Sequence, residues 1–148
     1  MRDPGNDSPA PHLPLTGHCL CGRVRFEVTE PFVGASWCHC TRCQRRTGTS
    51  GSLQGRVAPG ALRILAGEEL LRDYQPPDGF AKVFCSLCGS SLWSRSPDGE
   101  TFSVRFGVLD DDPGIRPSYR QFVAYAPSWD PLPDDGLPRF PERRPPDV

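Results

Sequence analysis

Short stretches of the chain alternate between apolar and polar residues. The clearest is Arg23–Val28, where Val24, Phe26 and Val28 alternate with charged side chains. Side chains of a strand point alternately to its two faces, so this pattern predicts a strand with one buried face.

Six further stretches with short apolar runs are predicted to be strands, because glycine- and proline-containing turns separate them. They are Ala61–Leu65, Leu70–Tyr74, Phe80–Phe84, Ser91–Ser96, Thr101–Val108 and Ser118–Val123. One short helix is expected after residue 40, with Thr41 as its N-cap and Gly48 ending it. Fifteen glycines and eighteen prolines leave little room for longer helices. The fold class is therefore predicted to be mostly β.

The length of 148 residues fits one domain. Residues 1–14 are polar and rich in proline, which predicts a disordered tail before a domain spanning 15–140. Residues 141–148 are expected to form a second disordered tail. The N-terminal residues lack the apolar stretch of a signal peptide, and no apolar run approaches the ~20 residues that span a bilayer. We expect a cytoplasmic protein that does not associate with membranes.

Charge argues against nucleic acid as a partner. The formal net charge is −1 and the isoelectric point is near 6.3. Binding to phosphate backbones normally requires clustered Lys and Arg, whereas this chain offers only a local basic patch of Arg42, Arg45 and Arg46.

The cysteines carry the candidate chemistry. Seven of them fall into three groups: Cys19 and Cys21; Cys38, Cys40 and Cys43; Cys85 and Cys88. An odd count without a secretory signal argues against a disulfide framework, and closely spaced cysteines in a reducing compartment more often bind metal. Four thiolates close a structural zinc site, while three leave a coordination position open to a substrate.

Spacing alone leaves two partitions of the cysteines open. One joins Cys40 and Cys43 to Cys85 and Cys88, but the 41 intervening residues exceed the common ribbon interval of roughly 15–20. The other joins the CxC pair to the CxxCG pair, in which Gly89 can adopt positive φ. It has a modest advantage, because the central three thiolates can then converge within six residues.

Four segments together resemble the glutathione-dependent formaldehyde-activating enzyme family, which also contains centromere protein V. They are Gly17–Gly22, Cys38–Arg45, Phe84–Ser90 and Leu137–Phe140. The resemblance covers about residues 15–140 and includes all seven ligand positions in order. It implies two small antiparallel sheets joined by a structural zinc site, a fold similar to methionine sulfoxide reductase B and the Rab-interacting zinc chaperones.

The resemblance also implies site roles and a reaction. Cys19, Cys21, Cys85 and Cys88 would hold a structural zinc ion, and Cys38, Cys40 and Cys43 would hold a second, catalytic ion that could be labile. The implied activity is that of a zinc-dependent carbon–sulfur lyase, which forms or cleaves S-hydroxymethylglutathione. The partners would be glutathione, or another small thiol, and formaldehyde or another aldehyde.

Other residues have weaker interpretations. His39 should point away from its cysteine neighbours, which favours a structural role over that of a proton shuttle. Arg45 and Arg46 could grip the carboxylates of glutathione or simply face solvent. The aromatic side chains of Trp37, Trp93, Phe106 and Trp129 are expected in the core rather than in a pocket wall.

Two other classes of function remain open. A non-catalytic zinc module could recruit another protein, although the basic tail of a chromatin-associated member is absent. A redox protein could exchange disulfides among Cys38, Cys40 and Cys43, although bound metal would suppress that chemistry.

Overall fold

The fold consists of two β-sheets and one short helix. It is taken from a computed structural model that describes residues 8–148 of the chain. The predicted tail, 1–14, lies partly outside this range. The strands are β1 (Leu15–His18), β2 (Arg25–Val28), β3 (Gly34–Cys38), β4 (Ser52–Arg56), β5 (Leu62–Ala66), β6 (Leu71–Tyr74), β7 (Ala81–Cys85), β8 (Ser91–Arg95), β9 (Phe102–Arg105) and β10 (Arg120–Gln121). Helix α1 is Thr41–Thr47, and the 3-10 turns are Glu68–Leu70, Phe106–Val108 and Val123–Tyr125. None of the helices in residues 8–148 has the length and apolar character to cross a membrane.

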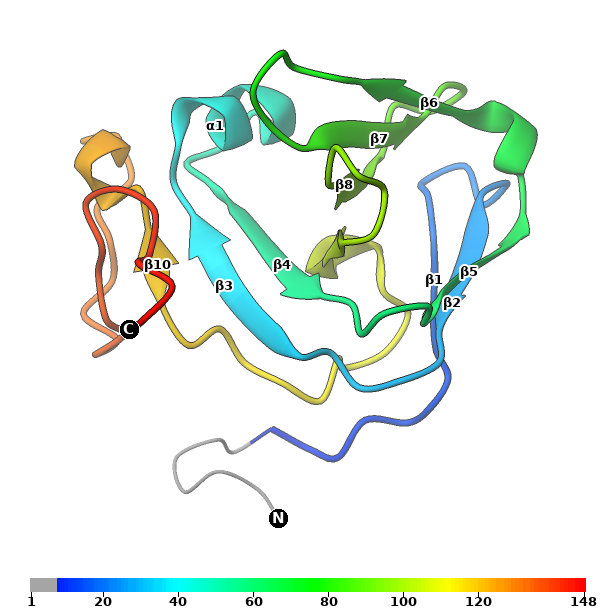
Figure 1. Ribbon diagram of the computed structural model, residues 1–148, viewed down its shortest axis with the longest axis horizontal. Coiled ribbons are helices and arrows are strands. Elements are labelled where there is room, and N and C mark those ends of the chain that lie inside the picture. Colours follow the sequence, from blue (N-terminus) through cyan, green and yellow to red (C-terminus); the bar gives the residue numbers. More distant parts are fainter. Residues whose placement is uncertain (1–7) are drawn as a thin grey trace.

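The mostly-β prediction is confirmed, but the sheets differ in size. The smaller has the order β1-β2-β5, and the larger has the order β10-β3-β4-β9-β8-β7-β6 (Figure 1). Strands pair antiparallel throughout, apart from β10, which pairs parallel to β3. A parallel neighbour needs a long connection, and here residue 120 returns beside residue 37. The likeness to methionine sulfoxide reductase B and the Rab-interacting zinc chaperones stays a prediction.

The apolar core lies between the two sheets. Phe26 of β2 and Trp93 of β8 meet edge to face, with ring centroids 5.4 Å apart. Both are almost fully buried, as are Val24 and Val28 from the predicted alternating stretch. Burial of Trp93 and partial burial of Phe106 agree with the core prediction. Trp129, however, is 68% exposed, because it follows Pro127 in an irregular segment and not in a strand.

Several predicted boundaries shift. The N-cap of α1 is Cys40 and not Thr41, because the Cys40 sulphur accepts from the Cys43 amide. Gly48 ends the helix with φ 72°, as predicted. Strand β10 has only two residues because Phe122 has a φ of 57°, which leaves the extended region.

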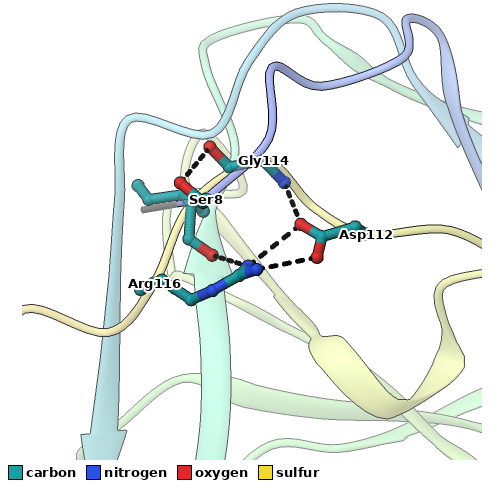
Figure 2. Close-up of polar contacts among 5 residues, drawn as sticks. Ser8, Asp112, Gly114 and Arg116 are labelled. Carbon is teal, nitrogen blue, oxygen red and sulfur yellow. Dashed lines mark hydrogen bonds and ion pairs between the residues drawn. The ribbon is translucent and has the colours of Figure 1, made fainter. Parts of the chain in front are cut away.

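Both terminal segments make contacts in the described part of the chain. The Ser8 hydroxyl donates to the Gly114 carbonyl, in a loop where Asp112 pairs with Arg116 (Figure 2). At the other end, the Phe122 amide donates to the Glu142 carbonyl over 3.0 Å. These contacts reach beyond the predicted domain limits of residues 15 and 140.

Candidate metal centres

Turns from the two sheets bring four cysteines together. Cys19 and Cys21 lie in the β1–β2 turn, and Cys85 and Cys88 lie where β7 turns into β8; their sulphurs all fall within 4.8 Å of one another. The Cys19 and Cys21 sulphurs are 3.4 Å apart, and those of Cys21 and Cys85 are 3.9 Å apart. Tetrahedral zinc with Zn–S bonds of about 2.3 Å separates its sulphurs by ~3.8 Å, whereas a disulfide bond measures about 2.05 Å. The spacing fits a metal.

At this four-cysteine cluster the pKa is lowered for Cys19 and Cys88, but for Cys21 a backbone hydrogen bond from Arg23 is outweighed by burial and the neighbouring sulphurs, which raise the pKa to about 11. The Val24 amide donates to the Cys19 sulphur over 3.3 Å. The Ser90 hydroxyl, 3.2 Å from the Cys88 sulphur, lowers the pKa of that thiol to about 5. Gly89 turns the chain at φ 79°, and its amide donates to the Cys85 carbonyl. This is the positive φ predicted for the CxxCG turn.

The other three cysteines gather at the start of α1. The sulphurs of Cys38, Cys40 and Cys43 lie within 4.8 Å of one another. Cys38 ends β3, Cys40 caps the helix and Cys43 faces inward from its first turn. The two cysteine groups are therefore those of the second partition considered from the sequence.

The electrostatics of this three-cysteine cluster suit a cation. Hydrogen bonds from Cys38 and Cys40, helped by the Ser52 hydroxyl and the charge of Arg46, hold the pKa of Cys43 well below its usual range. Hydrogen bonds with Cys40 and Cys43, together with burial, raise the pKa of Cys38. Crowded sulphurs compete for one negative charge, and a divalent cation would let all three ionise. The donor set therefore fits zinc with one position left for a further ligand.

His39 lies between two of these cysteines but outside the cluster of sulphurs. Its ring is only 2% exposed, and its Nδ1 lies 3.0 Å from the Ser50 carbonyl oxygen. Arg120 Nη1 donates to Nε2 over 3.0 Å, and Trp37 stacks on the ring at an interplanar angle of 10°. These contacts agree with the predicted structural role. Arg120, which also pairs with Asp135, carried no sequence signal.

A cavity of about 500 Å³ opens beside α1. Its wall includes the cationic side chains Arg42, Arg45, Arg46 and Lys82. None of the three cysteines lines this cavity, but helix α1 contributes Arg42, Arg45 and Arg46 to its wall and Cys43 to the cluster, and the charges of Arg46 and Lys82 act on those thiols. Burial and then the charge of Arg46 lower the pKa of Lys82.

The basic patch thus divides into three different environments. Arg42 is an exposed partner of Asp78, at 2.5 Å, and Arg45 is exposed on the helix. Arg46 turns inward, and its Nη1 donates to the Ser94 hydroxyl over 3.2 Å. Ser94 and Arg105 on the neighbouring strands carried no signal in the sequence, because isolated polar residues in strands are common.

Comparison with known proteins supports one family. The sequence profile described as "Glutathione-dependent formaldehyde-activating enzyme" matches residues 14–125. A protein of Halomonas elongata provisionally given that name is 33% identical over 123 residues, covering 78% of each chain. A similarly named Emericella nidulans protein is 26% identical over 98 residues, covering 64% of this chain and 50% of its own.

One solved structure is similar in fold. It is a Rhodobacter sphaeroides protein, with a TM-score of 0.56, 25% identity, and coverage of 84% of this chain and 98% of its own. Because the family profile spans most of the chain and includes both cysteine groups, the chain belongs to the glutathione-dependent formaldehyde-activating enzyme family.

Proposed function

We propose that this chain is a zinc-dependent carbon–sulfur lyase that forms or cleaves S-hydroxymethylglutathione. The observation that carries the proposal is the three-cysteine cluster at the start of α1, the helix that also lines a cationic cavity of about 500 Å³. Family membership supports glutathione and formaldehyde as the reactants. A reducing compartment such as the cytoplasm suits seven unpaired cysteines.

The two cysteine groups have different roles in this proposal. Cys19, Cys21, Cys85 and Cys88 would hold a structural zinc ion that ties the two sheets together. Cys38, Cys40 and Cys43 would hold the second ion. Zinc with an open position supplies a Lewis acid, which favours the ionised form of a thiol and polarises a carbonyl oxygen.

The reaction itself needs little further chemistry from the chain. In the forward direction the thiol sulphur forms a bond to the carbonyl carbon, the carbon–oxygen π bond breaks, and the thiol proton ends on the new hydroxyl. Arg46 and Lys82, whose charges act on the cluster, would keep the site attractive to an ionised sulphur and to negative charge on oxygen. The reverse direction cleaves the same carbon–sulfur bond.

NMR exchange spectroscopy tests the proposal. Wild-type protein loaded with zinc should accelerate exchange between glutathione, formaldehyde and their adduct, and Cys40→Ser at equal concentration should not. Metal analysis should give two zinc ions per wild-type chain and one per variant chain. Exchange in wild type no faster than in buffer would rule the activity out and leave a non-catalytic zinc module as the better description.

A further inference from the structure

One face of the larger sheet is polar where it meets α1. Lys82 of β7 lies opposite Ser94 of β8, and Gln54 of β4 lies opposite Arg105 of β9. Directly opposed residues of antiparallel strands share a face. Ser94 is 4% exposed and Arg105 is 8% exposed, so this polar face is largely shielded from water.

Two guanidinium groups meet on that face. Arg46 from α1 and Arg105 from β9 both donate to the Ser94 hydroxyl oxygen, and Arg105 also donates to the Gln54 amide oxygen over 2.8 Å. All of these acceptors are neutral. Within residues 8–148, no carboxylate oxygen lies within 4.0 Å of either guanidinium. The positive charges therefore face each other without an acidic partner in the described chain.

Several of their donors have no partner either. In the described part of the chain, Arg46 Nε, Arg46 Nη2 and Arg105 Nε are buried without a hydrogen bond. Buried polar groups in native proteins are nearly always satisfied, and an unpaired buried charge is costly. The Arg46 side chain as a whole is half-buried and lines the cavity, so it lies within reach of a ligand bound there.

The metal centre alone does not balance this charge. Three thiolates around a divalent cation carry one net negative charge, whereas Arg46, Arg105 and Lys82 carry three positive charges. The surplus is positive, and a planar guanidinium fork matches a carboxylate. An anionic ligand in the cavity would offset this charge and accept hydrogen bonds from Arg46, which lines the cavity.

We propose that Arg46 binds a carboxylate of the thiol substrate, and that Arg105, acting through Ser94, positions Arg46 for it. The site then selects thiols that carry a carboxylate over neutral thiols of similar shape. This inference rests on the proposed function, because it takes the substrate to be a thiol.

Calorimetry with zinc-loaded protein tests the selection with three probes. Glutathione carries both the thiol and the carboxylates, its diethyl ester lacks the negative charges, and S-methylglutathione lacks the free thiol. Wild type should bind glutathione at least ~10-fold more tightly than the diethyl ester. Arg46→Gln should weaken binding of glutathione and S-methylglutathione by ~10- to 100-fold, the usual size of a charge-assisted bond, and change binding of the diethyl ester little.

Arg63→Gln is the control, because Arg63 is exposed on β5 of the smaller sheet and does not line the cavity. It should change each dissociation constant by less than about threefold. Arg105→Lys should weaken binding of glutathione and leave binding of the diethyl ester unchanged, because the substitution alters the positioning of Arg46. Circular dichroism and thermal melting establish that each variant is folded.

The outcomes separate the two proposals. Equal losses for glutathione and its diethyl ester in Arg46→Gln, or no preference between them in wild type, would overturn the carboxylate site even if exchange catalysis persists. Selective, Arg46-dependent binding without exchange catalysis would retain the site and remove the lyase function. Failure of wild type to bind glutathione would overturn both.

Discussion

Arg120 Nη1 donates a hydrogen bond to His39 Nε2 over 3.0 Å, across 81 positions of the chain. Because an arginine can only donate, Nε2 accepts, and Nδ1 carries the proton that it donates to the Ser50 carbonyl. The guanidinium also lies 5.1 Å from the Trp37 ring centroid and pairs with Asp135. The C-terminal part of the chain therefore holds the Cys38–Cys40 segment in place, beside β3 in Figure 1.

The first prediction concerns this support. Arg120→Gln should weaken metal binding at Cys38, Cys40 and Cys43 by about 10- to 100-fold, the cost of losing a partner that orients a metal-binding segment. Competition with a chelator measures the zinc affinity of the weaker of the two sites. Arg116→Gln, which breaks an exposed ion pair with Asp112, serves as the control. Unchanged zinc affinity alongside a lower melting temperature would limit Arg120 to a purely structural role.

The second prediction concerns the close approach of Gly51 to the same segment. A Cβ atom on Gly51 would lie 2.7 Å from His39 Nδ1 and 2.8 Å from the Cys38 carbonyl oxygen. Gly51→Ala should therefore destabilise the fold by about 1–3 kcal/mol and weaken zinc binding at the three-cysteine cluster. Gly34→Ala in β3 is the control, because its Cβ would have nothing within 4 Å. Urea unfolding and zinc competition check both; equal behaviour of the two variants would contradict the predicted clash.

The third prediction concerns pH. The hydrogen bond from Arg120, with further help from the Leu137 amide, lowers the pKa of Asp135. A carboxyl group with a lowered folded-state pKa stabilises the fold above its unfolded pKa of about 3.9, and this stabilisation is lost as pH falls through the folded value. Asp135→Asn should therefore be less stable than wild type at pH 7, and the difference should shrink toward zero in strong acid. Urea unfolding at several pH values measures it, with the exposed Asp134→Asn as the control; a difference independent of pH would contradict this linkage.

The fourth prediction compares the two cysteine groups. Cys85→Ser should lower the melting temperature far more than Cys40→Ser. The cluster that contains Cys85 links turns of the two sheets, whereas the cluster that contains Cys40 is made of residues from one short segment. Structural zinc can couple on the order of 10 kcal/mol to folding, and a loss of only ~3 kcal/mol lowers the melting temperature by about 10 °C. Calorimetry of zinc-loaded proteins checks this. Similar losses in the two variants would argue against one structural and one functional site.

Local signals in the sequence were enough for several features. The alternation over Arg23–Val28 predicted a buried strand face, since side-chain direction in a strand depends on neighbouring residues alone. Gly48 and Gly89 marked turns with positive φ, which few other residues adopt cheaply. The cysteine spacing narrowed the ligand sets to two partitions, one of which matches the observed clusters.

Strands β3 and β4 were not predicted, and the reason lies in their surroundings. Ser36, Ser52 and Gln54 face the polar side of the sheet, so these strands lack the apolar alternation of a surface strand. Gly55 leaves room for Phe32 and Phe106, whose atoms would lie 2.7–2.8 Å from an added Cβ. Only the packed sheet makes these residues suitable for a strand.

By itself, the sequence determined which residues could bind metal and where the chain turns, because thiolate spacing and backbone preference are local properties. Tertiary structure alone decided what surrounds those ligands. Arg46 and Arg105 meet at Ser94, and Arg120 reaches His39, only because strands distant in sequence pair and α1 packs against the polar face. Charges and hydrogen bonds act over a few ångströms of space, and separation along the chain does not reveal such proximity.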